Sequence, residues 1–451
     1  AVKNDSLYWQ EVRPIPLTPE ERVTLKERDS IMGTGGPAVR SDTVPVTYGR
    51  RRNRLTLKGL AMGKTYRADK GRFQFVHEGL LDPEMLGYNT VDGLSYGQSL
   101  RLNWRFDTIH TFRSHLLAGY AFHRKAPRIT WNSELLYAPL YRGKLGLYVN
   151  YTSADFNGES GIPGFTNLAY TLLFRENYLK LYEQAEVRLY NQIDLANGLS
   201  LITSATAGWR NRLENNSDFS FFFSERKDFT PNIPHELPED NPSLEGLKDL
   251  SGSVRLEYTP RNYYVIRNYR KHMTGSAWPT FYMEYRHAFP LQTGEWSDYK
   301  VLSGGLDHRF DVGLLSELEW KAEAGYYLRT AAMHFSDYRH FKSAPLLIDM
   351  AGLGHALAVM DYYEASTDDY WVSGEAVLTS SYLLLKFLPW FSERLWKESI
   401  RVNYLYTPAT PQYLQAGYSL NELFFLLDVG VYGAFQQGGY KGWGVRLNLR
   451  F

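Results

Sequence analysis

The feature that most constrains this chain is a strict alternation of apolar and polar residues near its end. Between positions 443 and 451 every odd position is apolar, and the positions between them carry Gly444, Arg446, Asn448 and Arg450. Because successive side chains of a β-strand point to opposite faces, this run predicts a strand with one apolar and one polar face. Soluble strands are usually about 5–6 residues long and membrane-crossing strands about 9–11, so the length favours a membrane protein.

The same pattern recurs upstream with more charge on the polar face. In Leu314–Arg329 that face carries Glu317, Glu319, Lys321 and Glu323. Such a face needs water, whereas the opposite face suits lipid, where every backbone group must be paired. The sequence therefore predicts an all-β fold, a transmembrane antiparallel β-barrel. Its polar lumen is expected to be lined by Glu319, Lys321, Glu323, Arg446 and Arg450.

Strands are predicted wherever this alternation recurs. The ranges are 53–62, 72–78, 95–107, 112–124, 129–139, 142–151, 181–194, 199–210, 251–259, 279–289, 298–310, 314–329, 370–382, 398–406, 412–420, 424–435 and 440–451. These are seventeen, and bacterial single-chain barrels have an even number of strands. We therefore expect about 16 strands, with one of these assignments wrong.

The rest of the chain divides into a terminal segment and long loops. Residues 1–43 lack alternation, and Thr18, Pro19 and Glu21 resemble the start of a short helix, which we place in the periplasm. Residues 44–451 are expected to form the barrel, with long loops near 154–180, 211–250 and 330–369. Leu168–Tyr182 partly follows a helical period, so a short helix at the rim or in the mouth, acting as a plug, would fit there, but the pattern does not decide this.

Composition supports a membrane barrel. The chain is 15% aromatic, with 34 Tyr and 11 Trp, and such residues form girdles at both membrane interfaces of barrels. No stretch approaches the 18 or more apolar residues that a membrane helix needs, which excludes a helical membrane protein. The net charge of +1 gives no general attraction to nucleic acid. The lack of cysteine fits passage through an oxidising periplasm.

The last residue is itself a candidate signal. Phe451 is an aromatic residue that ends an alternating strand. This arrangement matches the C-terminal signal by which assembly machinery recognises new outer-membrane barrels, so we interpret Phe451 as an assembly signal.

Five short motifs carry a resemblance to a known family. They are Trp9 with Arg13–Thr18, Asn89–Leu94, Asn177–Tyr182, Tyr338–Phe341 and Asp361–Thr367. Together and in this order they resemble outer-membrane barrels of Bacteroidota, a family of unsettled function that usually follows a carboxypeptidase-regulatory-like β-sandwich. The resemblance spans nearly the whole chain and implies a bacterial outer-membrane location.

The C-terminal half is also similar to the superfamily of barrels that assemble outer-membrane proteins or secrete partner proteins. In that superfamily a loop before the twelfth strand folds into the lumen and carries an Arg-Gly-Phe-type tip. Here the 330–369 loop precedes the fifth strand from the end, and His340 replaces the glycine between Arg339 and Phe341. The resemblance implies that Arg339 pins the loop to the wall through a carboxylate, for which we name Glu375. The alternative is an ordinary solvated loop arginine.

Enzymatic chemistry finds little support in the sequence. His334, Asp337 and His340 are close together but lack the spacing of known zinc sites, so we expect no metal. The lumen carboxylates have Lys321 among them, which favours mixed-sign pairing in water over catalysis. No Gly-x-Ser-x-Gly motif occurs. We therefore expect neither catalytic residues nor a cofactor.

Two functions of different class remain. The first is a component of outer-membrane protein assembly or export, acting in envelope biogenesis. Its partners would be a bilayer containing lipopolysaccharide and envelope proteins, such as lipoproteins or periplasmic subunits, and not nucleic acid. The second is a diffusion or substrate-specific channel of the porin kind, in which the charged lumen would be a selectivity lining.

Overall fold

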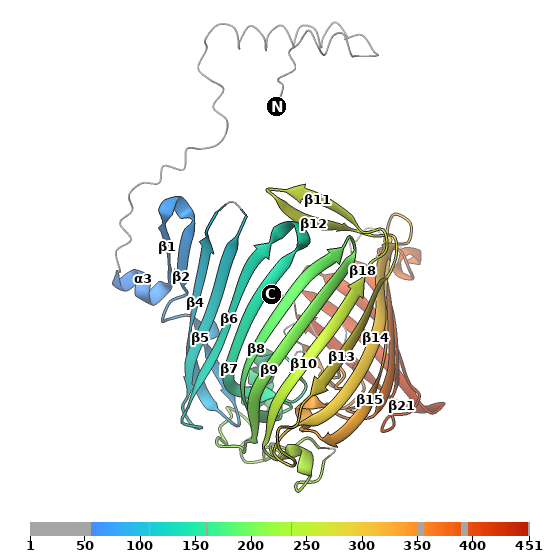
Figure 1. Cartoon of the computed structure of the whole chain (residues 1–451). Helices are drawn as coiled ribbons and strands as arrows, with labels where there is room; N and C mark the ends of the chain where they lie inside the picture. The colour runs from blue at the N-terminus through green and yellow to red at the C-terminus, as the bar shows by residue number, and fades with distance from the viewer. Residues whose placement is uncertain are drawn as a thin grey trace, which may run out of the picture. The chain divides into compact units, whose positions relative to one another are not determined.

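The computed structural model describes residues 56–107, 109–158, 161–235, 237–349, 356–388 and 396–449. The expected N-terminal helix within 1–43, Arg450 and the assembly signal Phe451 lie outside these residues. Within them the chain is built around one sheet of 19 strands. This confirms the predicted all-β antiparallel barrel architecture (Figure 1).

Long strands alternate with short helical turns along the chain. The strands are β1 Lys64–Ala68, β2 Phe73–His77, β3 Leu86–Asn89, β4 Gly93–Arg105, β5 Thr111–Ala121, β6 Ala126–Ala138, β7 Gly143–Asp155, β8 Leu181–Ala196, β9 Leu199–Arg212, β10 Leu247–Tyr258, β11 Tyr263–Arg267, β12 Arg270–Gly275, β13 Thr280–Ala288, β14 Asp298–Asp311, β15 Ser316–Ala332, β16 Ile348–Asp349, β17 Tyr370–Ser380, β18 Lys397–Tyr406, β19 Tyr413–Leu423, β20 Leu427–Gln436 and β21 Gly439–Leu449. The helices and helical turns are α3 Leu57–Met62, η1 Asp69–Gly71, η2 Pro83–Met85, η3 Pro139–Tyr141, α4 Gly164–Ala169, η5 Tyr170–Phe174, η6 Pro242–Leu244, η7 Phe335–Asp337 and η8 Leu385–Phe387. Among the described residues, no helix is long and apolar enough to cross a membrane.

The wall runs in chain order through antiparallel pairs from β2 to β21. β2 and β3 both pair with β4, at its two ends, so they act as one interrupted strand. With β3 counted in this way, and with the short strands β1 and β16 set aside, the 19 strands reduce to 16. In the described part of the chain, the outer edge of β21 pairs only with β16, in a parallel bridge of Ile348 with Leu447 and of Asp349 with Asn448.

The predicted division into an outer and an inner face holds along β15. Tyr326 and Leu328 are more than half exposed on the outer face, while Glu319 and Lys321 face the lumen and are exposed there. Glu323 lies in the same lumen phase but is buried. It is therefore not the solvated lumen carboxylate that we expected, because a loop covers it, as described below.

The first predicted strand, 53–62, is wrong. Residues Leu57–Met62 form helix α3, whose first turn is capped by the Thr56 side chain, which accepts a hydrogen bond from the Gly59 amide at 3.1 Å. This N-cap signal favours a helix over a strand. The other predicted strands each coincide with an observed strand, to within a few residues at most ends.

Long connections gather at one end of the barrel. The connections 156–180, 213–246 and 333–369 link β7 to β8, β9 to β10 and β15 to β17. Because consecutive wall strands alternate in direction, all three leave the wall at the same end. The hairpin β11–β12, which the sequence did not predict, lies between β10 and β13 at the opposite end (Figure 1).

Candidate functional site

The described residues of the three long connections fold together into one body, which we call the plug (residues 156–158, 161–180, 213–235, 237–246, 333–349 and 356–369). Their apolar side chains share a buried cluster with wall residue Tyr182, and its larger plug members are Phe156, Ile162, Tyr170, Leu244, Phe335, Leu346, Tyr362 and Tyr363. A short helix, α4, does occur in the first connection, but it starts at Gly164, before the Leu168–Tyr182 stretch, and continues into the π-helical turn η5. Leu181 and Tyr182 belong to strand β8. Because each connection contributes to the same core, the plug is held by burial of apolar surface and is not a set of separate solvated loops.

The wall is apolar on its inner face where the plug meets it. Tyr299, Tyr327 and Trp371 form one buried cluster there, and Leu405, Tyr413 and Ala434 belong to another with plug residues such as Met360. Their strands otherwise present polar residues in this phase. The plug therefore packs against the lumen side of the wall and lies inside the barrel at this end.

Arg339 joins the plug to the wall through Glu323 of β15. Its Nη2 lies 2.6 Å from Glu323 Oε1. The same carboxylate accepts hydrogen bonds from Tyr282 Oη at 2.6 Å and from Trp371 Nε1 at 3.0 Å. The guanidinium also lies 5.7 Å from the centre of the Trp371 ring, a cation–π distance. Glu323 thus has three strong donors at a buried position, the arrangement that a buried carboxylate requires.

The partner named from the sequence, Glu375, needs correction. Glu375 lies opposite Lys321 in the register of β15 and β17, and its carboxylate is 3.6 Å from Arg401 Nε. Glu375 and Arg339 line the same cavity of about 120 Å³, but the ion pair that the structure shows for Arg339 is with Glu323. Glu375 lies two positions farther along the wall from the plug end than Glu323, and it has Arg401 as a neighbouring cation.

A second charged contact ties the plug to another part of the wall, four strands away from β15 in the sheet order. Arg210 of β9 donates from Nη1 to Asp337 Oδ2 at 2.6 Å, and its Nη2 lies 3.6 Å from Asp249 Oδ2. Asp337 also accepts a hydrogen bond from Tyr299 Oη at 3.1 Å. Burial raises the pKa of the Asp337 carboxyl, against the lowering effect of the Arg210 charge. All these side chains are buried, so neither charge has bulk water as an alternative partner.

Polar side chains of two further strands bind the backbone of the 333–369 connection. Arg446 of β21 donates to the carbonyls of Ala344 at 2.6 Å and Ala356 at 3.2 Å. Gln415 Oε1 of β19 accepts a hydrogen bond from the Ala358 amide at 2.9 Å. With Glu323 and Arg210, these contacts reach strands on several sides of the wall, so this connection crosses the lumen.

The three residues weighed as metal ligands each make other interactions. His340 Nε2 lies 2.8 Å from the Phe335 carbonyl and Nδ1 lies 2.7 Å from Ser366 Oγ. A carbonyl only accepts, so Nε2 carries the proton and Nδ1 accepts from the serine hydroxyl. Burial lowers the pKa of His340 to about 4 and that of His334 well below its usual value. Asp337 binds Arg210 as above. Among the described residues no cluster suited to a metal ion is found.

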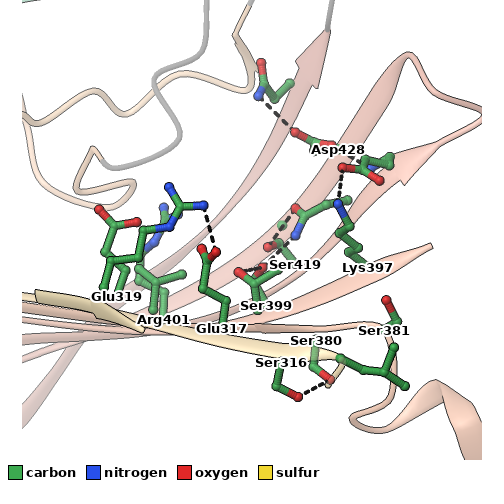
Figure 2. Close-up of a pocket in the computed structure, with 18 of the residues that line it drawn as sticks. Ser316, Glu317, Glu319, Ser380, Ser381, Lys397, Ser399, Arg401, Ser419 and Asp428 are labelled. Atoms are coloured by element: carbon green, nitrogen blue, oxygen red, sulfur yellow. Dashed lines mark hydrogen bonds and ion pairs between the residues drawn. The ribbon is translucent and has the colours of Figure 1, made fainter. Parts of the chain in front are cut away.

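Beyond the plug the lumen keeps a polar chamber of about 610 Å³, which we call the charged chamber. Figure 2 shows charged and hydroxyl side chains from several strands lining it. Arg309 and Glu317 pair at 2.7 Å, Lys397 and Glu422 at 2.9 Å, and Ser316 donates to Ser380 at 2.7 Å. Its lining carries four basic and five acidic side chains, so the chamber is hydrophilic without a strong preference for cations or anions.

The structure brings some predicted site residues together and separates others. Arg339 and Glu323 form the central contact, Arg446 binds the plug, and Glu319 lies apart in the charged chamber. Lys321 reaches Glu323 at 3.5 Å. The sequence analysis missed Arg210 as an anchor. The sequence did contain a signal for the plug itself: large apolar residues such as Trp371 lie in the lumen phase next to long loops, and such residues indicate a packed interior.

Comparison with known proteins finds one family. Residues 57–420 match the family described as "Family of unknown function (DUF5686) C-terminal domain". No curated protein is significantly similar in sequence to the chain.

The chain shows low similarity to several β-barrels of known structure. One is Wzi of Escherichia coli, described as a carbohydrate-binding β-barrel involved in group 1 capsule assembly, with 10% identity over 86% of this chain and 78% of that one and a TM-score of 0.35. BamA of Haemophilus ducreyi lacking POTRA domains 1–3 has 11% identity over 85% and 68% and a TM-score of 0.42. A mutant porin of Rh. blastica has 8% identity over 78% and 88% and a TM-score of 0.32.

Proposed function

The chain belongs to this family of unknown function, and we propose that it is an outer-membrane barrel with a closed lumen that serves envelope biogenesis, as a component of outer-membrane protein assembly or export. The observation that carries the proposal is the plug. Three connections share a common core, and one of them, 333–369, crosses the lumen and is fixed to the wall by charged contacts. A pore for passive diffusion needs an open passage, and a fixed plug works against one.

The orientation follows from loop lengths. Outer-membrane barrels carry short turns on the periplasmic side and long loops outside the cell. The plug end then faces outward, and the end with the β11–β12 hairpin faces the periplasm. Partner proteins of the envelope would meet the barrel at that periplasmic end.

Gentle purification from native membranes tests this function. We expect lipoproteins or periplasmic subunits to co-purify with the barrel, and we expect its depletion to lower the amounts of other outer-membrane proteins. A lone conductive trimer, with unchanged amounts of those proteins after depletion, would reject the proposal and favour the channel.

The channel stays as the second candidate because of one observation. The charged chamber of about 610 Å³ would suit a hydrophilic solute. In that function the plug would have to move for each passage, so disruption of the Arg339–Glu323 contact would increase solute uptake by intact cells.

A further inference from the structure

The β11–β12 hairpin is an added element at the barrel end opposite the plug. Most other connections at this end are short, such as residues 197–198 between β8 and β9 and 312–315 between β14 and β15, and the connection 381–396 between β17 and β18 is the longer exception. The hairpin forms its own two-stranded sheet, closed by Asn268 and Tyr269, both with positive φ. A two-residue turn of this kind matches the twist of paired strands, so the hairpin is a defined structure.

The hairpin is fixed across the mouth of the lumen. Lys271 Nζ lies 3.1 Å from Asp194 Oδ2, and Arg142 binds the same carboxylate at 2.7 Å. Arg270 donates to Thr111 Oγ1 at 2.6 Å. Asp194 and Thr111 are buried lumen-phase residues near the ends of β8 and β5. Because it is held by lumen-facing groups, the hairpin covers the aqueous mouth and does not lie on the lipid face.

The outer strand of the hairpin is open. All five residues of β11 are exposed, among them Tyr263, Val265 and Ile266. Within the described part of the chain, β11 pairs with β12 alone. Arg267 and Arg270 flank the two-residue turn and form a hydrogen-bonded pair, so the N–H and C=O of Ile266 point away from β12. Such an edge is a template for a further strand.

The hairpin is also strongly basic. Residues 260–275 contain Arg261, Arg267, Arg270 and Lys271 and no Asp or Glu. Lys271 is neutralised by Asp194, whereas no carboxylate forms an ion pair with the three arginines among the described residues. Burial, together with the positive charges of Arg113 and Arg105 on the nearby wall, lowers the pKa of Arg270. The local field therefore favours a negatively charged partner.

We propose that the free edge of β11 is a docking site for an acidic, extended segment of a water-soluble protein, which adds to the hairpin as a third strand. Backbone hydrogen bonds to the edge would supply affinity, and carboxylates next to Arg261 and Arg267 would supply specificity. The site lies at the opposite end of the barrel from the plug. The proposed docking does not depend on whether the barrel serves assembly or conducts solutes.

Binding of a labelled peptide to the full chain in detergent tests the site. The probe is the fluorescein-labelled peptide EVETEVETE, in which acidic residues alternate with β-branched ones, and the readout is fluorescence anisotropy in 50 mM salt. We expect saturable binding that weakens at least tenfold in 300 mM salt, and no binding of the analogue with Lys in place of each Glu. No saturable binding of the acidic peptide would overturn the proposal.

Two pairs of variants separate the contribution of the β11 backbone edge to peptide binding from that of the arginine charges. Ile266→Pro removes the outward N–H and should weaken binding at least fivefold, whereas Ile266→Thr keeps that N–H and should bind nearly as wild type. Arg261→Gln with Arg267→Gln should weaken binding at least fivefold, whereas Lys125→Gln, in the β5–β6 turn at the plug end, should not. Heat-dependent gel mobility confirms that each variant is folded. Equal binding by Ile266→Pro and Ile266→Thr would reject strand addition. Binding to phosphatidylglycerol vesicles that outcompetes the peptide would instead assign the hairpin to lipid.

Discussion

At the scale of single residues, a few charged side chains hold the plug. The buried Glu323 receives Arg339, Tyr282 and Trp371, while Arg210 holds Asp337 on another part of the wall. Buried pairs add little net stability compared with apolar packing, but removal of one partner leaves an uncompensated charge. The plug should therefore respond strongly to single substitutions at these sites.

The first prediction concerns Arg339. Arg339→Ala removes the nearer of the two cations at Glu323 and leaves only Lys321, at 3.5 Å. It should destabilise the closed plug by about 2–3 kcal/mol, a value discounted because the arginine side chain is about a third exposed. Limited proteolysis should then cut within 333–369 faster. Arg339→Lys should restore the protection only in part, because lysine lacks the guanidinium plane that lies near Trp371.

The matched control is Arg309→Ala, which removes an exposed lumen arginine paired with Glu317. It should leave proteolysis of the plug unchanged. Equal protection of wild type and Arg339→Ala would show that the contact does not hold the loop.

The second prediction concerns His340 and pH. Its pKa is about 4 in the closed plug and about 6.5 when exposed, so the closed form binds fewer protons between these values. The neutral imidazole stabilises the closed plug fully above pH 6.5, and this stabilisation decreases as pH falls toward 4. The total loss is up to about 3 kcal/mol. Hydrogen exchange of 333–369 should accelerate in acid.

The control for this prediction is His340→Gln. Glutamine can donate to the Phe335 carbonyl and accept from Ser366 but does not titrate. The raised pKa of Asp337 means that this carboxyl favours the closed plug as pH falls, which opposes the effect of His340. The difference in stability between wild type and His340→Gln is therefore the quantity to measure. A difference that stays constant from pH 7.5 to 5 would contradict the assignment.

At the scale of elements, local pattern predicted the wall, whereas the inward fold of the 330–369 loop was implied only by resemblance and the shared core of the three connections was not predicted. Alternation depends on which face each side chain occupies, a local property, so β15 and β21 could be assigned from sequence alone. The Arg339–Glu323 contact joins a loop to a strand through a fold that no local pattern encodes, and Glu375 was chosen because it shares the lumen phase. Helix α3 was missed because Leu55 and Leu57 alternate with Thr56 and Lys58 as strand residues do, whereas the Thr56 cap that favours a helix is a weaker signal.

The third prediction tests the two faces of β15. Ala324 lies on the lipid face in the middle of the strand, and Ala324→Arg should cost about 2–4 kcal/mol in folding into lipid vesicles. Glu319→Arg, in the exposed lumen phase five residues earlier, should cost little. Urea titrations of both variants in vesicles measure this. Similar costs would show that the faces are wrongly assigned.

At the scale of the whole molecule, the barrel combines a packed end and a hydrated end. Apolar residues in the lumen phase, such as Tyr299 and Leu405, are buried where the plug meets the wall, whereas the charged chamber stays polar. Alternation and composition together indicated a membrane barrel, but they are the same for a packed and for a hydrated lumen. The distinction between a closed barrel and a pore required the contacts between distant segments.

The closed lumen is the central claim, and ion conductance of the purified protein in planar bilayers tests it most directly. Wild type should show no stable open state, because the 333–369 connection crosses the lumen and is fixed by Glu323, Arg210 and Arg446. Arg339→Ala should show brief openings, and Arg309→Ala should behave as wild type. A wild-type barrel that conducts steadily, with a current unaffected by Arg339→Ala, would contradict the plug and favour a simple channel.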